Sequence, residues 1–429
     1  MEIFLPIALL FILLAIGIPV GFCLAVAGAV GLYMVGGVGA MLGILQTAPY
    51  RSAASYTLTT IPMFLLMAQY ATKSGITQEI FDGAKAWFGH FRGGLATASV
   101  FASAGIGAIS GSSSATAAMM AGVAVPEMVR HGYDKRLALG SVAAAGTLAI
   151  MIPPSTVLIL YGILAEQSIG KLLIAGIIPG VILSLAYVAT IWHWVRKKAE
   201  LAPAAEKMSW RERFVSVKKF WPVVVVAVVV LGGIYTGIIT PTESAAIGSV
   251  CMLAIAKLFW KLRWSEVYQS TLAAVRTTSM IFMIVIGAHI FGYYLTLTQV
   301  TQNLVNFVAG LDVSKWVILL IICLMYLILG CFMDLIAILV LTVPLTYPIM
   351  DALGFDLIWY GIIVTLLGEI GLITPPVGLN VFVGASAAKL PVEVGFAGIW
   401  RFVVASLIVL VLLIIFPELA TWLPSNMKN

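Results

Sequence analysis

The sequence predicts an all-α, polytopic membrane protein built from two related halves. The first observation is composition: 62% of the 429 residues are hydrophobic and 10% are charged, with a mean hydropathy of +1.09. A soluble domain cannot bury so much apolar surface, and apolar runs of ~20 residues recur along the chain. The second observation is a Pro-Pro pair inside an apolar segment of each half, at Pro153-Pro154 and Pro375-Pro376.

The apolar runs divide into ten predicted spans and two predicted re-entrant hairpins. The spans cover about residues 3–20, 22–46, 55–72, 138–165, 172–195, 221–238, 244–260, 277–295, 358–385 and 395–424. The two other apolar stretches, 94–126 and 316–348, are interrupted near the middle by polar and small residues, so each is predicted to enter and leave the membrane on one side. Each half then crosses the membrane an odd number of times, which makes the second half inverted relative to the first.

The two Pro-Pro pairs are separated by 222 residues (375 − 153), and this offset aligns other residues that fix backbone geometry. The aligned pairs are Pro19 and Pro241, Pro126 and Pro348, Gly132 and Gly354, Asp134 and Asp356, Gly146 and Gly368, Gly162 and Gly384, and Gly176 and Gly398. We therefore predict two inverted repeats, 1–195 and 220–429, with broken helices at 153–154 and 375–376. Such paired interruptions in two halves of a membrane chain are typical of a transporter's binding site.

The basic residues indicate how the chain is oriented. The segment 196–219 carries eight Lys or Arg residues against three acids, so it is predicted to be a solvated cytoplasmic linker. Counting outward from this linker puts 20 of the 24 basic residues inside and leaves Arg51, Lys171, Lys315 and Lys428 outside. The first hairpin then opens from the cytoplasm, the second opens from the outside, and both termini lie outside. The net charge of +6 reflects this bias and does not indicate a nucleic-acid partner.

The tip of the first hairpin carries a run of small polar residues, Ser-Gly-Ser-Ser-Ser at 110–114. Irregular backbone at membrane depth is tolerated only inside protein or against a water-filled cavity. The hydroxyls and freed carbonyls of this tip are therefore candidate ligands. The alternative is that small residues here only allow close helix packing.

The Pro-Pro pairs predict cation sites. Because proline has no N–H, each pair leaves carbonyl oxygens of the preceding turn without their helical partners. The affected carbonyls are those of Ala149, Ile150 and Ile152 in the first half and of Gly371, Leu372 and Thr374 in the second. Oxygen ligands suit a hard monovalent cation, so each broken helix that faces its hairpin tip is predicted to form one site. A simple kink in each helix is the alternative.

Ionisable and polar residues at membrane depth supply further candidates. Asp334 lies at the second hairpin tip, at the repeat position of Ser112, while Glu369 precedes the second Pro-Pro pair and Glu243 follows Pro241. Acids inside spans are proton carriers or ion ligands by default, although Glu243 fits better as an acceptor at a helix start. The candidate substrate-binding residues are Ser112, Ser113, Ser155, Asp334 and Asn380. His289 stands alone in its span and is interpreted as a packing residue.

Five ordered motifs resemble the large membrane subunit, the M subunit or DctM-like component, of tripartite ATP-independent periplasmic (TRAP) transporters. They are SGSSSATAA at 110–118, IPPS at 152–155, GIITPTESAAIG at 237–248, GCFMD at 330–334 and GLITPPVGLNVFV at 371–383. The resemblance covers nearly the whole chain. It implies a sodium-driven importer of organic acids in the bacterial inner membrane that uses an elevator motion. It also implies two partners, a small four-span membrane subunit and a periplasmic substrate-binding protein, with no such small subunit fused to this chain.

The resemblance also assigns ligands for at least two Na⁺ ions per cycle. It places them on Ser110, Ser112, Ala149, Ile152 and Pro154 for one site, and on Gly330, Met333, Gly371 and Thr374 for the other. These positions agree with the carbonyls that the proline argument selects.

Three alternatives to a sodium-driven transporter follow from the same residues: an intramembrane enzyme, a channel and a proton-coupled carrier. An intramembrane enzyme lacks a credible Ser/His pair, because His131 lies in a predicted loop and His289 in a distant span. A channel would need a continuous polar pathway, whereas the polar groups gather at two breaks. A proton-coupled carrier that uses Asp334 or Glu369 stays open as the alternative coupling.

Overall fold

The computed structural model describes residues 3–205 and 207–427, and every regular element in that part of the chain is a helix. This confirms the predicted all-α class. The elements of the first half are α1 (Phe4–Ala15), α2 (Val20–Ala53), η1 (Thr57–Thr59), α3 (Thr60–Ser74), α4 (Ile76–Phe88), α5 (Gly94–Ser110), α6 (Ser113–Arg130), α7 (Lys135–Gly146), α8 (Leu148–Met151), α9 (Thr156–Leu164), α10 (Ile169–Ala175) and α11 (Ile177–Lys197).

The remaining elements follow in the linker and the second half. They are η2 (Ala199–Leu201), α12 (Trp210–Val217), η3 (Lys218–Phe220), α13 (Trp221–Ala227), η4 (Val228–Gly232), α14 (Gly233–Tyr235), α15 (Pro241–Phe259), α16 (Trp264–Leu297), α17 (Val300–Ala309), α18 (Lys315–Gly330), α19 (Leu335–Ala352), α20 (Leu357–Leu372), α21 (Leu379–Ala388), α22 (Val392–Ile415) and α23 (Glu418–Ser425).

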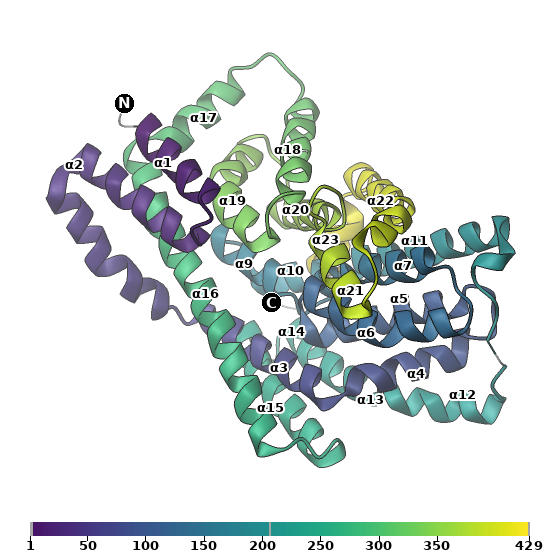
Figure 1. Cartoon of the computed structure of the whole chain (residues 1–429). Helices are drawn as coiled ribbons and strands as arrows, with labels where there is room; N and C mark the ends of the chain where they lie inside the picture. The colour runs from purple at the N-terminus through teal and green to yellow at the C-terminus, as the bar shows by residue number, and fades with distance from the viewer. Residues whose placement is uncertain (1–2, 206, 428–429) are drawn as a thin grey trace.

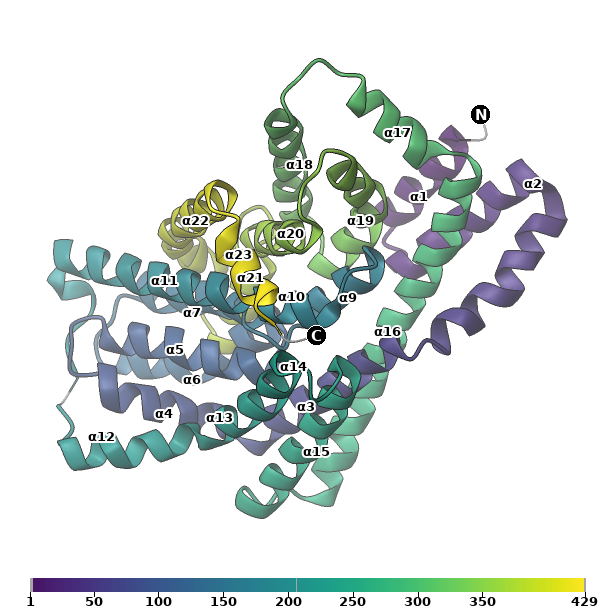
Figure 2. The ribbon, with the colours of Figure 1, turned by 180° about the vertical axis from the view of Figure 1, so that it is seen from behind.

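Two groups of helices lie beside each other in the molecule (Figure 1). The long helices α2 and α16 pack together and form an arm with α1, and α3 and α15 pack side by side below it. The hairpins and broken helices form the second group, in which α6 packs on α7 and α21, and α18 packs on α20. The view from behind shows the same division (Figure 2). Elements from both halves of the chain therefore meet in each group.

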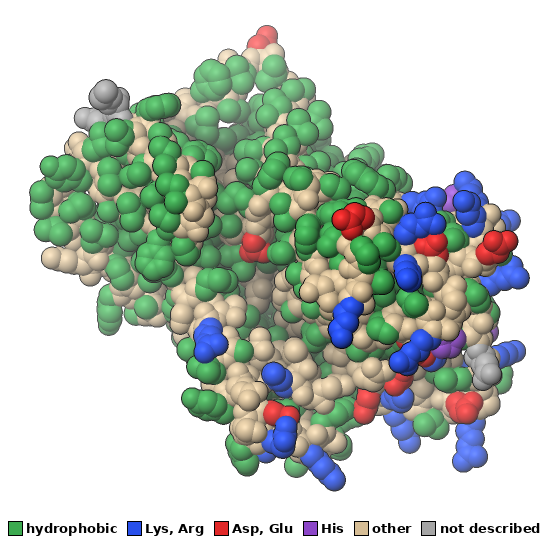
Figure 3. All heavy atoms as spheres, viewed as in Figure 1, with side chains coloured by type: hydrophobic (Ala, Val, Ile, Leu, Met, Phe, Trp, Pro, Cys, Tyr) green, Lys and Arg blue, Asp and Glu red, His purple; other side chains and the backbone are tan. Residues whose placement is uncertain are grey.

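The surface is that of a membrane protein. Large apolar side chains are widely exposed, among them Phe4, Val250, Leu320 and Ile408, each more than 60% exposed. Figure 3 shows hydrophobic side chains over the upper and left part of the molecule, with Lys and Arg gathered along the right and lower margins, where α11, α12 and α15 lie. Exposed apolar side chains at this density are stable against lipid rather than water.

Seven helices among the described residues are long and apolar enough to cross a membrane, or eight if the pair α7–α8 and α9, bent by 46°, is one span. One of them is α19, which the sequence analysis places as the second limb of a hairpin. The shorter apolar helices include α1, which lies in the predicted span 3–20, and α20 and α21, which overlap the predicted span 358–385. They also include α5 and α18, the first limbs of the two predicted hairpins. The total of ten spans and the inverted orientation of the halves stay predictions.

The offset of 222 residues recurs in the places where helices begin. The helices α6 and α19 begin at residues 113 and 335, and α7 and α20 begin at residues 135 and 357. Before α7 and α20 the chain turns through Gly132 (φ 80°) and Gly354 (φ 72°), a backbone conformation that glycine adopts without strain. Asp134 and Asp356 then accept hydrogen bonds from backbone N–H groups of the first turn. The two halves therefore share helix starts and the turn and capping residues before them, as well as an order of motifs.

The linker differs from the solvated loop that its charge predicts. It contains the helix α12, which begins with a capping box between Ser209 and Glu212. The ring of Phe214 on α12 meets that of Trp87 on α4 with their centroids 6.0 Å apart. The large apolar side chains of this helix, Trp210, Phe214, Val215 and Val217, are all exposed, so no buried apolar face marks it in the sequence. The limits 196–219 stay a predicted boundary.

Candidate functional site

The first hairpin turns between α5 and α6 through two residues. Gly111 has a left-handed backbone (φ 58°) and Ser112 is extended, so α6 begins at Ser113. A Cβ at Gly111 would also lie 2.8 Å from the carbonyl oxygen of Pro154. Glycine is therefore required here both for the turn and for the close approach to the broken helix.

This tip lies against the first Pro-Pro break. The hydroxyl of Thr156 donates a hydrogen bond to the carbonyl of Gly111 (3.1 Å), and the hydroxyls of Ser110 and Thr116 are 2.7 Å apart. One turn before the tip, a Cβ on Gly107 would be 2.6 Å from the Cα of Ala149. The hairpin tip that carries Ser110 and Ser112 is therefore in contact with the segment that carries Ala149, Ile152 and Pro154. Thr116 and Thr156 add hydroxyls that the site prediction did not include.

The second half repeats this arrangement. The N–H of Val377, just past Pro375-Pro376, donates to the carbonyl of Cys331 at the second tip (3.3 Å). A Cβ on Gly330 would be 2.9 Å from the Cα of Gly371. The second tip and the second break are therefore in contact, as the sequence predicts, and their residues include Gly330, Met333, Gly371 and Thr374.

Both broken helices stop where proline removes a backbone donor. The first ends with α8 at Met151 and resumes with α9 at Thr156; the second ends with α20 at Leu372 and resumes with α21 at Leu379. In the second break the hydroxyl of Thr374 donates to the carbonyl of Ile370 (2.6 Å). This hydrogen bond fixes the side chain and leaves lone pairs of its oxygen for another ligand.

A buried polar cluster joins the two halves next to these breaks. The hydroxyl of Ser113, at the start of α6, donates to Oε2 of Glu369 on α20 (2.7 Å). The amide of Asn380, on α21, donates to the same Ser113 oxygen (2.6 Å). The three side chains are at most 2% exposed. Within the described residues, Oε1 of Glu369 and Oδ1 of Asn380 have no hydrogen-bond partner, so two buried acceptor oxygens remain for a cation, a proton or a ligand.

The other substrate candidates occupy different positions. Ser155 is fully buried and its hydroxyl accepts from the N–H of Leu158 (3.3 Å), so it caps α9. Asp334 caps α19 through the N–H of Ile336 (3.2 Å) and is exposed at the tip. Ser112 is half-buried and makes no such cap. Among the five predicted residues, Ser113 and Asn380 are joined by a side-chain hydrogen bond.

Two further side chains have clear roles in the structure. Glu243 closes a capping box with Thr240, the helix-start role that the sequence analysis favoured. His289 is not a packing residue: its Nδ1 is 2.7 Å from the hydroxyl oxygen of Ser52 on α2. Because its polar partner is 237 residues away in the chain, this contact leaves no local pattern in the sequence.

An all-helical membrane chain whose polar groups gather at paired breaks has the architecture of a secondary transporter. Residues 7–419 match the family model described as Tripartite ATP-independent periplasmic transporter, DctM component. The chain belongs to this family, as its five motifs indicate. It is a transporter permease and not an enzyme.

Its relatives carry different substrates in their names. The chain is 38% identical over 377 residues to the C4-dicarboxylate TRAP transporter large permease protein DctM of Pseudomonas aeruginosa. This match covers 88% of each chain. It is 30% identical over 413 residues to the sialic acid TRAP transporter large permease protein SiaM of Vibrio cholerae, and 32% identical over 421 residues to the ectoine TRAP transporter large permease protein TeaC of Halomonas elongata, with 96% of each chain covered in both cases.

A solved structure shares the fold. The YdaH transporter of Alcanivorax borkumensis, described as having an unusual topology, superposes with a TM-score of 0.60 over 90% of this chain and 89% of that chain. At 13% sequence identity, this likeness concerns the fold alone.

Proposed function

We propose that this permease is a sodium-coupled secondary transporter that imports an organic acid by an elevator motion. The observation that carries the proposal is the contact of each hairpin tip with its own broken helix. At both places the structure puts serine or threonine hydroxyls and the carbonyl-rich end of a helix together, and such oxygens suit a hard monovalent cation.

Two such places support the coupling of two or more Na⁺ ions to each transport cycle. The proposed ligands are Ser110, Ser112, Ala149, Ile152 and Pro154 at the first place, and Gly330, Met333, Gly371 and Thr374 at the second. The proposed substrate residues Ser112, Ser113, Ser155, Asp334 and Asn380 lie at the same tips and breaks. Ion binding would thus fix the hairpins against the broken helices before the substrate moves.

The family supports a bacterial inner-membrane location, a periplasmic binding protein that delivers the substrate, and a small four-span membrane subunit. The isethionate TRAP transporter permease protein DctMQ of Oleidesulfovibrio alaskensis is 32% identical over 381 residues, and the match covers 60% of that protein. That relative therefore has room for a further membrane component beside the shared part. Periplasmic termini follow from the charge distribution of the present chain.

Proton coupling is the second candidate, and the buried cluster favours it. Glu369 is 1% exposed and its Oε1 has no partner among the described residues, so this oxygen is available to carry a proton. Asp334, exposed at the second tip, fits this role less well because its carboxylate already caps α19.

Replacing Na⁺ by K⁺ tests the proposal. In proteoliposomes that hold the permease with its two partners, labelled succinate, N-acetylneuraminate and ectoine represent the substrate classes of the relatives. We expect uptake of the transported compound to disappear in K⁺ and to return in Na⁺, because the smaller cation fits the oxygen sites. Full uptake driven by a proton gradient without Na⁺ would contradict the proposal and move coupling to Glu369 or Asp334.

A further inference from the structure

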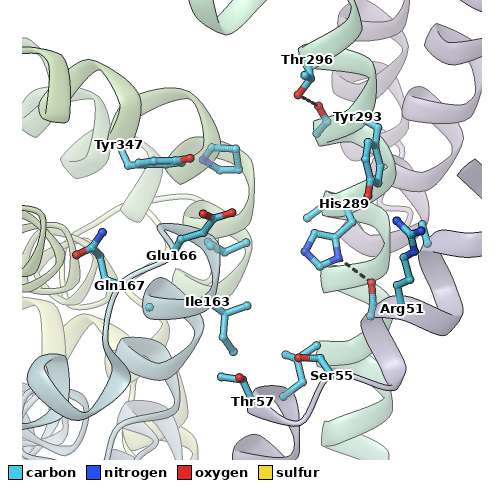
Figure 4. Close-up of a pocket in the computed structure, with 18 of the residues that line it drawn as sticks. Arg51, Ser55, Thr57, Ile163, Glu166, Gln167, His289, Tyr293, Thr296 and Tyr347 are labelled. Atoms are coloured by element: carbon cyan, nitrogen blue, oxygen red, sulfur yellow. Dashed lines mark hydrogen bonds between the residues drawn. The ribbon is translucent and has the colours of Figure 1, made fainter. Parts of the chain in front are cut away.

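A cleft of about 750 Å³ separates the arm from the hairpin group. One wall comes from the end of α2, η1 and α16, and the other from the end of α9, the loop that follows it and α19. Figure 4 shows the side chains of the two walls facing one another across this space. The volume is within the range of small-molecule sites, so a ligand of substrate size can enter.

The arm wall carries the groups that recognise an anion. Arg51 lies in the last turn of α2, and no ion pair among the described residues includes it. His289 stands at the cleft with Nδ1 held by the Ser52 hydroxyl, which leaves Nε2 for a ligand. The hydroxyls of Ser55 and Thr57 line the same wall. A guanidinium with neighbouring hydroxyls is suited to a carboxylate.

The opposite wall carries a negative charge. Glu166 lies in the loop between α9 and α10, with a left-handed backbone (φ 53°), and Gln167 follows it. Figure 4 places Glu166 across the cleft from His289 and Arg51. No ion pair among the described residues includes Glu166. This wall therefore accepts hydrogen bonds or pairs with a cation, and it repels a second carboxylate.

The cleft is connected to the hairpin tips by the helices that line it. Its hairpin-group wall is formed by the far ends of α9 and α19, and these helices begin at the first Pro-Pro break and at the second hairpin tip. The predicted topology puts Arg51 on the outer side of the membrane, where a periplasmic protein would release its cargo.

We propose that this cleft is a receiving site for an organic acid that carries one carboxylate and a hydroxyl or ammonium group. Arg51 and His289 hold the carboxylate, and Glu166 accepts a hydrogen bond from the other end. The proposal rests on the proposed function for the idea that the bound acid is cargo. It adds that the permease itself selects against compact dicarboxylates, because their second carboxylate would lie close to the negative charge of Glu166.

The charge of each wall can be measured without knowing the substrate. In a chain with its four cysteines replaced, Ser55→Cys gives one reactive thiol in the cleft. This thiol is treated with two methanethiosulfonates, one bearing a sulfonate and one bearing a trimethylammonium group, and the ratio of the first rate to the second is measured. We expect Arg51→Gln to lower this ratio about fivefold and Glu166→Gln to raise it. Lys315→Gln, a change outside the cleft, serves as the control. An unchanged ratio in Arg51→Gln would overturn the proposal.

Protection of the same thiol tests the ligand class. The probes are 4-aminobutyrate, 4-hydroxybutyrate and succinate, which share a four-carbon chain and differ at one end. We expect the first two to slow labelling at concentrations at least tenfold lower than succinate does, Glu166→Gln to remove this preference, and Arg51→Gln to weaken all three. Equal protection by succinate, or protection that survives Arg51→Gln, would contradict the site.

The uptake assay keeps this proposal separate from the proposed function. If protection depends on Arg51 but uptake does not depend on Na⁺, the cleft is supported as a receiving site and sodium coupling is contradicted. If uptake is driven by Na⁺ but no such protection is seen, sodium coupling is supported and the cleft is contradicted as a receiving site.

Discussion

Gly371→Ala is expected to abolish transport while the chain still reaches the membrane. A Cβ at Gly371 would clash with the backbone of Gly330, because the two glycines let α18 and α20 touch next to the second tip. The hairpin must move away by a few tenths of an ångström or more, and overpacking of this kind costs about 1–3 kcal/mol. The same movement separates the oxygens proposed as the second Na⁺ site.

The measurement compares the uptake and the thermal unfolding of purified Gly371→Ala with those of the control variant Gly122→Ala. Gly122 lies inside α6, and a Cβ there has no neighbour within 4 Å. The control should keep full uptake and be equally or more stable, since alanine favours a helix over glycine by about 1 kcal/mol. Normal Na⁺-dependent uptake by Gly371→Ala would show that the contact of tip and broken helix is not needed.

Glu369→Ala is expected to destabilise the protein and to stop transport. The substitution leaves the Ser113 hydroxyl, 2% exposed, without its acceptor, and it cuts the bond that joins α6 to α20. Loss of a hydrogen bond to a charged or potentially charged group costs about 1.5–3 kcal/mol. A lower unfolding temperature should therefore accompany the loss of uptake.

Glu369→Gln is the matched variant, because its amide oxygen can still accept from Ser113 while the carboxyl is gone. Under sodium coupling this variant should regain the stability of the unchanged chain and most of its uptake in Na⁺. A stable Glu369→Gln protein that transports nothing at any Na⁺ concentration would instead identify the carboxyl as the coupling group and support the proton alternative.

The sequence predicted the features that backbone chemistry determines. Proline without a donor N–H breaks α8 from α9 and α20 from α21, and glycine with a positive φ turns the chain at Gly111, Gly132 and Gly354. These effects act within a few residues, so their positions and their offset could be found in the sequence. The pairing of each tip with its own break followed from the same repeat.

Contacts between distant side chains could not be predicted in this way. Ser113 and Asn380 were both named as substrate residues, yet nothing in their neighbourhoods indicates that Asn380 binds Ser113 or that Ser113 binds Glu369, 256 residues away. The same holds for Ser52 and His289. Ser155, predicted to bind the substrate, caps the start of α9 instead of pointing to a distant partner. A serine after Pro-Pro can cap a helix as readily as it can bind a ligand, and its local sequence does not distinguish the two roles.

Labelling from the two sides of the membrane tests the central claim, that one unit of hairpin and broken helix is used twice in opposite orientations. Single cysteines at Asp134 and Asp356, which begin α7 and α20, are treated in intact cells and in inverted vesicles with a reagent that does not cross membranes. A third cysteine at Lys198 marks the cytoplasmic side. The account predicts that positions 134 and 198 label only from the cytoplasm and position 356 only from the periplasm. Labelling of 134 and 356 from the same side would show parallel halves and contradict the account.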